Sequence, residues 1–241
     1  MDVNLDGPGS LRPGDRSVGG PSNKGLADVQ AAVFDLDGTL VLSEARNRAV
    51  WTGFFDAHGV EVDEALLAFV TGRRGEDSLT ELAHLFPGWT LDGLADSIRE
   101  VEGRLALPAV EAVPGAVAYV QRLHRAGVPL ALVTSARGAH AAGHLQDTGL
   151  AEALAVRVVA EDVQQGKPHP EGYLAACDAL RVEPACAVAF EDSAAGVAAV
   201  KAAGMYCVAL TTTHEVVALD GADLIVSDLS TLVWPPLPAS T

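Results

Sequence analysis

The stretch Ala31-Ala32-Val33-Phe34-Asp35-Leu36-Asp37-Gly38-Thr39-Leu40 decides the fold of this chain. Its first four residues are apolar without interruption, which is typical of a strand buried on both faces of a parallel sheet. The run ends at two aspartates, Asp35 and Asp37, two positions apart. Carboxylates at a strand end can divide catalytic work, one as nucleophile and metal ligand and the other as proton donor. An Asx-rich turn is the structural alternative for the same residues.

Apolar runs of the same kind recur along the chain and alternate with helical patterns. The strand-like runs cover residues 130–133, 156–159, 187–190, 207–210 and 224–226. Helices are predicted over residues 115–127, 173–180 and 193–204, from apolar residues at helical spacing and from Pro, Ser and Gly at their ends. Strands that alternate with helices indicate a parallel sheet with right-handed crossovers. The predicted fold class is therefore α/β.

Residues 43–111 interrupt this alternation. They show helical patterns at 46–57, 64–69, 76–86 and 91–105 and no convincing strand. We expect an all-helical domain inserted after the first strand, lying over the carboxyl edge of the sheet, where open α/β folds bind ligands. The core domain then comprises residues 29–42 and 112–241, and the cap domain residues 43–111.

The first 28 residues differ in composition from the rest. They hold six Gly, three Pro and three Ser, and their apolar residues follow no helical or strand period. We expect a flexible N-terminal tail.

Charge and cysteine content exclude several classes of protein. Sixteen Lys and Arg against 32 Asp and Glu leave a net charge of −16, which disfavours nucleic acids and anionic membrane surfaces as partners. No apolar run approaches the length of a membrane span, and the N-terminus lacks a secretory signal pattern. Cys177, Cys186 and Cys207 form no metal or redox spacing, so we expect a soluble protein of the reducing cytoplasm. The oligomeric state is left open, and a monomer is compatible with the sequence.

Three further polar elements follow predicted strands. Thr134 and Ser135 offer hydroxyl and backbone N–H groups to an anion, although helix capping is the commoner role for such residues. Lys167 lies between restrictive prolines in the segment 166–170, although most lysines are simply solvated. Glu191 and Asp192 form a paired acid suited to a divalent cation, or else part of a helix start. The structural alternatives require four independent coincidences at one sheet edge, so the functional interpretation is favoured.

The four elements resemble the motifs of the haloacid dehalogenase superfamily of aspartate-nucleophile phosphohydrolases. The resemblance covers nearly everything after residue 28 and implies a Rossmann-like core with a helical cap at 43–111. Segments 163–171 and 190–196 are similar to members that dephosphorylate small sugar and polyol phosphates, such as glycerol-3-phosphatases and 2-deoxyglucose-6-phosphatases. The implied activity is therefore that of a phosphoric monoester hydrolase acting on a small phosphorylated metabolite.

The resemblance also implies a mechanism. Asp35 attacks phosphorus to form an aspartyl-phosphate, while Asp37 protonates the leaving group and then activates water. Lys167 stabilises the phosphoryl oxygens, and Thr134 or Ser135 binds them.

A Mg²⁺ ion is the implied cofactor. Its expected ligands are the Asp35 carboxylate, the Asp37 backbone carbonyl and Asp192, with Glu191 beyond the direct ligands.

Cap residues are expected to select the substrate. Arg73 and Arg74 lie between two predicted cap helices, and Arg74 is the preferred substrate contact because the sugar phosphatases carry a comparable arginine. An exposed arginine that only solvates the surface is the alternative. Trp51, Phe54 and Phe55 line a pocket or, more commonly for such a cluster, pack in the cap core.

His140 and His144 have the i, i+4 spacing of a helical zinc motif. Ala141 stands where a zinc protease needs Glu, so we interpret the pair as helix-surface histidines.

Two alternative functions stay open. A phosphosugar mutase of the β-phosphoglucomutase type uses the same aspartates, but Asn47 stands where such mutases have a histidine that couples cap closure to acid–base chemistry. Gly75 also stands where they carry a phosphate-binding arginine. A non-catalytic phospho-ligand binder is disfavoured because it needs no aspartyl nucleophile.

Overall fold

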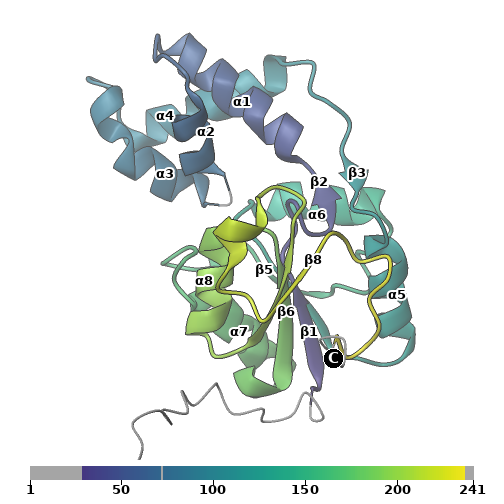
Figure 1. Cartoon of the computed structure of the whole chain (residues 1–241). Coiled ribbons are helices and arrows are strands. Elements are labelled where there is room, and N and C mark those ends of the chain that lie inside the picture. The colour runs from purple at the N-terminus through teal and green to yellow at the C-terminus, as the bar shows by residue number, and fades with distance from the viewer. Residues whose placement is uncertain (1–28, 72, 237–241) are drawn as a thin grey trace, which may run out of the picture.

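Six parallel strands form the main sheet, in the spatial order β5-β4-β1-β6-β7-β8 (Figure 1). This computed structural model of the 241-residue chain describes residues 29–71 and 73–236, so the expected tail at 1–28 lies outside the described residues. The strands are β1 Ala31–Phe34, β4 Leu130–Val133, β5 Val156–Val158, β6 Ala187–Glu191, β7 Tyr206–Leu210 and β8 Leu224–Val226. The predicted α/β class is confirmed, and each expected strand lies within one residue of its predicted position.

Strand β1 lies inside the sheet, between β4 and β6, and its side chains pack on both faces. Ala32 and Phe34 belong to one apolar cluster, whereas Ala31 and Val33 belong to the cluster on the other face. Successive side chains of a strand point to opposite faces, so a strand covered on both sides must be apolar throughout. The first cluster includes residues of α5 Ala116–Arg125 and α6 Gly138–Asp147, and the second includes residues of α7 Glu171–Leu180 and α8 Ala194–Ala202.

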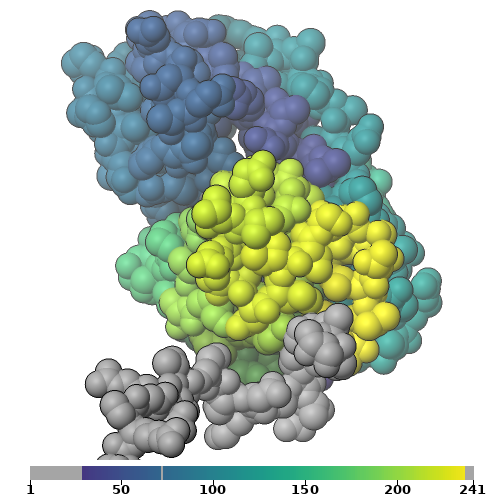
Figure 2. All heavy atoms as spheres, viewed as in Figure 1, coloured from purple at the N-terminus to yellow at the C-terminus, as the bar shows by residue number. Residues whose placement is uncertain are grey.

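Four helices that follow β1 in the sequence and precede β4 form a separate apolar cluster. They are α1 Glu44–Ala57, α2 Glu64–Val70, α3 Gly75–Glu81 and α4 Leu91–Arg104, with the 3₁₀ turn η2 Ala83–Leu85. Phe54, Phe55, Phe86 and Leu94 lie buried at the centre of this cluster. The helices form a separate mass above the sheet (Figures 1 and 2). We propose that residues 43–111 are the expected cap domain, since this segment has its own apolar core.

Two short strands that the sequence did not predict join the cap to the core. β2 Val41–Leu42 and β3 Glu111–Ala112 pair antiparallel, at the two ends of the inserted helices. Strands of two residues have no measurable apolar period, so pattern analysis does not detect them. The remaining 3₁₀ turns are η3 Ala160–Asp162, η4 Pro184–Cys186 and η5 Val216–Leu219. Among the described residues, no helix has the length and apolar character that crossing a membrane requires.

Candidate active site

A buried ion cluster lies where β1 and β6 end. The Lys167 ammonium contacts carboxylate oxygens of Asp35 and Glu191, each at 2.5 Å. It also donates to the Val133 backbone carbonyl at 3.4 Å. Each of the three charged side chains is less than one-tenth exposed. One ammonium therefore serves two buried carboxylates from neighbouring strands.

Both carboxylate oxygens of Glu191 accept several hydrogen bonds from neighbouring groups. One of its oxygens accepts from Lys167 and from the Tyr173 hydroxyl at 2.7 Å. The other accepts from the backbone N–H groups of Asp192 and Ser193 and from the Ser193 hydroxyl, at 3.0 to 3.2 Å. The first turn of α8 approaches this carboxylate so closely that a Cβ at Gly196 would lie 1.9 Å from the Glu191 carboxyl carbon. Glu191 therefore positions the lysine and the following loop.

Asp192 faces the loop after β1. Its carboxylate accepts a short hydrogen bond from the Thr213 hydroxyl, in the loop after β7. Gly38 has a φ of +82°, and a Cβ there would lie 2.0 Å from a carboxylate oxygen of Asp192. Only glycine adopts this backbone conformation without strain and leaves room for the carboxylate. The Asp-x-Asp-Gly turn thus brings Asp192 within reach of Asp35.

Asp35, Glu191 and Asp192 form a group that could hold a metal ion, with one oxygen from each lying within 4.8 Å of the others. Burial, with the nearby carboxylates of Glu191 and Asp37, raises the pKa of Asp35 to about 8, although Lys167 acts in the opposite direction. Burial and the charges of Asp35 and Glu191 also raise the pKa of Asp192. Both raised pKa values reflect the cost of ionising buried carboxylates that lie close together, and a divalent cation bound at this group would stabilise their ionised forms.

Burial penalises the ammonium form of Lys167, but the charges of Asp35 and Glu191 outweigh that penalty and raise its pKa. The pKa of Glu191 is lowered despite burial, because Lys167, Tyr173 and the Ser193 N–H all stabilise its ionised form. Lys167 is therefore charged and Glu191 ionised near neutral pH.

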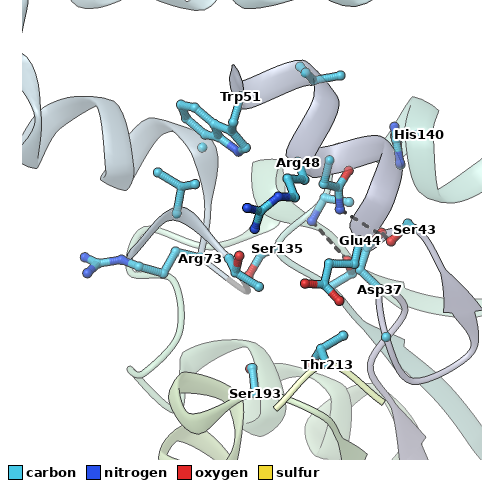
Figure 3. A pocket seen from close by; sticks show the side chains of 18 of the residues that line it. Asp37, Ser43, Glu44, Arg48, Trp51, Arg73, Ser135, His140, Ser193 and Thr213 are labelled. Atoms are coloured by element: carbon cyan, nitrogen blue, oxygen red, sulfur yellow. Dashed lines mark hydrogen bonds between the residues drawn. The ribbon is translucent and has the colours of Figure 1, made fainter. Parts of the chain in front are cut away.

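The second aspartate of the motif has different surroundings. Asp37 is half-buried and accepts a short hydrogen bond from the Ser43 hydroxyl, at the start of α1. The Asn47 amide donates to the same hydroxyl at 3.4 Å. Figure 3 shows Asp37 and Ser43 together beside the pocket. The cap helix α1 thus orients Asp37.

A cavity of about 950 Å³ lies between cap and core. Its core side includes Asp35, Asp37, Thr134, Ser135 and Asp192, so three of the four predicted motif elements, all except Lys167, contribute to one wall. Its cap side presents charged and aromatic groups, among them Arg48, Trp51 and Arg73, which Figure 3 shows around the opening. Thr134 is buried, and its hydroxyl accepts from the Ala136 N–H at 3.0 Å, so it shapes the turn after β4.

The two candidate cap arginines have different surroundings. Arg74 donates to the Val163 carbonyl at 2.8 Å and to the Gln164 carbonyl at 3.2 Å, and it pairs with Asp77 at 2.8 Å. It lines a smaller neighbouring cavity that also includes Lys167. Arg73 lines the large cavity and pairs with Glu81. In this structure Arg74 therefore joins the cap to the core segment that precedes Lys167.

Phe54 and Phe55 are fully buried in the cap core, while Trp51 lines the cavity, so the cluster divides between the two expected roles. The interpretation of His144 as a surface residue is wrong, because its side chain is buried, as are those of Ala141 and Leu145 on the same helix. His140 lines the cavity.

Three residues of the site were missed from the sequence. Ser43 bonds Asp37, Tyr173 bonds Glu191 and Thr213 bonds Asp192. The sequence position of Thr213 could have identified it, because it follows the apolar run of β7 just as the other site residues follow their strands. The helical pattern of the sequence predicts Tyr173 only as an apolar position, yet a buried phenol requires a hydrogen-bond partner.

Comparisons with known proteins identify the family. Residues 29–204 match the model of the haloacid dehalogenase-like hydrolases. The chain is 41% identical to the validoxylamine A 7'-phosphate phosphatase of Streptomyces hygroscopicus subsp. limoneus, over 86% of this chain and 97% of that protein. It is 34% identical to hexitol phosphatase A of Escherichia coli, over 82% and 90%.

A solved structure agrees in fold. The β-phosphoglucomutase of Clostridium difficile superposes with a TM-score of 0.73 at 20% identity, covering 86% of this chain and 94% of that one. The phosphatase relatives are thus closer in sequence than this mutase. The chain belongs to the haloacid dehalogenase-like hydrolase family and is a phosphoric monoester hydrolase, as its motifs indicate.

Proposed function

We propose that this hydrolase is a Mg²⁺-dependent phosphatase of small sugar or polyol phosphates that works through an aspartyl-phosphate on Asp35. The observation that carries the proposal is the placement of Asp35 and Asp37 on the wall of one large cavity, with Asp35 held against Lys167. A nucleophile and a proton donor are thereby directed at the same bound ester.

The chain's own groups account for each step. An Asp35 oxygen forms a bond to phosphorus, and the bond from phosphorus to the leaving oxygen breaks. Asp37 gives its proton to that oxygen and then takes a proton from the water that hydrolyses the acyl-phosphate. Ser43 holds Asp37 in place, and Lys167 places positive charge beside the nucleophile. Thr134 and Ser135 line the same wall and would bind phosphoryl oxygens.

The donor set fits a magnesium ion. The Asp35 and Asp192 carboxylates with the Asp37 backbone carbonyl would hold it, since oxygen atoms are the ligands that Mg²⁺ prefers. Glu191 would lie beyond the direct ligands because its oxygens are already hydrogen-bonded. When bound, the ion supplies positive charge that neutralises the phosphoryl oxygens.

The substrate class follows from the relatives and from the cavity. Two phosphatase relatives are named for validoxylamine A 7'-phosphate and hexitol substrates. A cavity of about 950 Å³ with several charged side chains has room for a phosphorylated polyhydroxy compound. The three free cysteines support a cytoplasmic location.

The test is phosphate release from a panel of hexose, pentose, polyol and nucleoside monophosphates, with and without Mg²⁺. We expect release from sugar or polyol phosphates that requires the metal and is lost in Asp35→Asn. Turnover that persists in Asp35→Asn, or in chelator-treated protein, contradicts the mechanism.

The mutase alternative has its own assay. The protein is given β-glucose 1-phosphate with glucose 1,6-bisphosphate, and glucose 6-phosphate and free phosphate are followed together. Asn47, which bonds Ser43 beside Asp37, stands where such mutases have a histidine that couples cap closure to acid–base chemistry. An amide does not titrate near neutral pH, so it lacks that coupling, and we expect phosphate release to dominate. Isomerisation that outpaces release, with the panel inert, overturns the phosphatase assignment.

A further inference from the structure

Two histidines on α6 face each other one helical turn apart. The Nε2 atoms of His140 and His144 lie 2.8 Å from one another, and the ring centroids are 4.4 Å apart. Residues at i and i+4 lie on the same face of a helix, which is how helical zinc motifs place two imidazoles on one ion.

A carboxylate from another element completes the group. Ligand atoms of Asp37, His140 and His144 all lie within 4.8 Å of one another. The aspartate comes from the loop after β1 and the histidines from α6, so the fold brings together groups about a hundred residues apart in the sequence. Two imidazole nitrogens and one carboxylate oxygen form a donor set distinct from the all-oxygen group around Asp192.

The surroundings prepare both imidazoles for metal binding. His144 is buried and His140 is half-buried, so the surrounding protein holds both rings in place. On the far side of the His140 ring, Nδ1 lies 4.0 Å from a carboxylate oxygen of Glu102 on α4. Metal-binding histidines commonly donate a hydrogen bond from their second nitrogen to a carboxylate, and Glu102 lies close enough to become that partner after a small side-chain movement.

We propose that Asp37, His140 and His144 form a second metal site that binds Zn²⁺, and that Zn²⁺ bound there inhibits the enzyme. Imidazole nitrogens favour zinc over magnesium, and three protein ligands leave a fourth position open to the cavity. Tetrahedral coordination at Zn–N distances of about 2.0–2.1 Å requires the two nitrogens to separate to roughly 3.3 Å. A small rotation of the partly exposed His140 ring provides that separation.

Inhibition follows from the identity of the carboxylate. Zn²⁺ bound to the Asp37 carboxylate occupies an oxygen that proton transfer needs, so the ion blocks the transfer from Asp37 to the leaving group. This consequence rests on the proposed function, whereas binding of the ion does not.

The binding test uses the full chain in saturating Mg²⁺, titrated with Zn²⁺ by calorimetry. We expect one Zn²⁺ per chain, with affinity lowered at least roughly 10-fold in His140→Gln and in His144→Gln. His124→Gln, at an exposed position on α5, is the matched control and should bind as the wild type does. His140→Gln keeps the test valid if the buried His144 variant fails to fold. Equal Zn²⁺ affinity in wild type and His140→Gln overturns the proposal.

The inhibition test measures phosphate release against Zn²⁺ concentration at saturating Mg²⁺. We expect the inhibiting concentration to rise in His140→Gln by the same factor as the dissociation constant. If Zn²⁺ inhibits wild type and variant equally and extra Mg²⁺ reverses this in both, zinc acts at the magnesium ligands and the proposal is wrong. A protein that releases no phosphate from any substrate contradicts the proposed function, while the calorimetric result still decides the zinc site.

Discussion

The Lys167 ammonium lies 2.5 Å from an oxygen of the Asp35 carboxylate, and both groups are almost completely buried. The lysine comes from the loop before α7 and the aspartate from the end of β1, so 132 residues of sequence separate the two. The contact fixes the direction of the nucleophile before any substrate binds. It also makes the stability of the core depend on the charge balance of the active site.

Removing the lysine charge should destabilise the protein strongly. Lys167→Met leaves Asp35 and Glu191 buried without a cation, which typically costs about 3–5 kcal/mol of unfolding free energy. Urea unfolding measures the loss, and Lys201→Met, which removes a partly exposed partner of Asp223, should cost about 1 kcal/mol or less. Asp35→Asn added to Lys167→Met should restore part of the stability. Equal losses in the two lysine variants would show that the buried pair is not essential to the core.

The stability of the metal-free protein should fall as pH rises from about 5 to 8. The pKa of Asp35 is raised from 3.8 to about 8 and that of Asp192 is raised as well, so between these values the folded state binds more protons than the unfolded state. The free energy of unfolding therefore decreases with pH across that window. Thermal unfolding at several pH values, with and without Mg²⁺, measures this. Added Mg²⁺ and the Asp35→Asn substitution should each flatten the profile, and a slope unchanged by both would exclude Asp35 as its source.

Asp192→Asn should weaken Mg²⁺ binding by roughly 10-fold or more, because the substitution removes a charged ligand. The Mg²⁺ concentration that gives half-maximal phosphate release measures the change. Asp220→Asn, at an exposed position beyond η5, is the control and should leave that concentration unaltered. Wild-type metal dependence in Asp192→Asn would place the ion elsewhere.

Asp37→Asn should lower turnover of sugar phosphates by roughly 10²-fold or more, since the amide neither donates an acidic proton nor accepts one. An aryl phosphate with an acidic phenol as leaving group needs less protonation, so its first step should suffer less. Rapid-quench measurement of the phosphoenzyme separates the two steps. Equal losses for both substrates would assign Asp37 a structural role.

Arg74→Met should separate cap attachment from substrate contact. Arg74 donates to two core carbonyls and is mostly buried, so its loss should cost about 1.5–3 kcal/mol of unfolding free energy. The control Arg73→Met loses only a partly exposed pair with Glu81 and a contact with the Phe69 ring, worth about 1 kcal/mol. If the two variants are equally stable, Arg74 is free to act as the substrate contact that the sequence predicts.

The motifs of this site were predictable because of one property of parallel sheets. Apolar runs marked the strands, and the carboxyl ends of parallel strands meet at one edge, so the polar residues that follow them converge whatever the loops do. Asp35, Thr134 and Asp192 are placed in this way. The cap stays a prediction, which rests on several consecutive helical patterns with no strand between them, and the helices observed there share an apolar cluster of their own.

Only the tertiary structure decided the contacts that depend on loops and on the seating of the cap. Whether Arg73 or Arg74 faces the cavity depends on the backbone just before α3, which apolar periodicity does not encode. His144 is buried although its spacing matches an exposed stripe equally well, because the neighbours that cover it come from elsewhere in the chain. Hydrogen bonds such as Ser43 to Asp37 form between segments whose relative position the whole fold determines, so residue type alone does not reveal them.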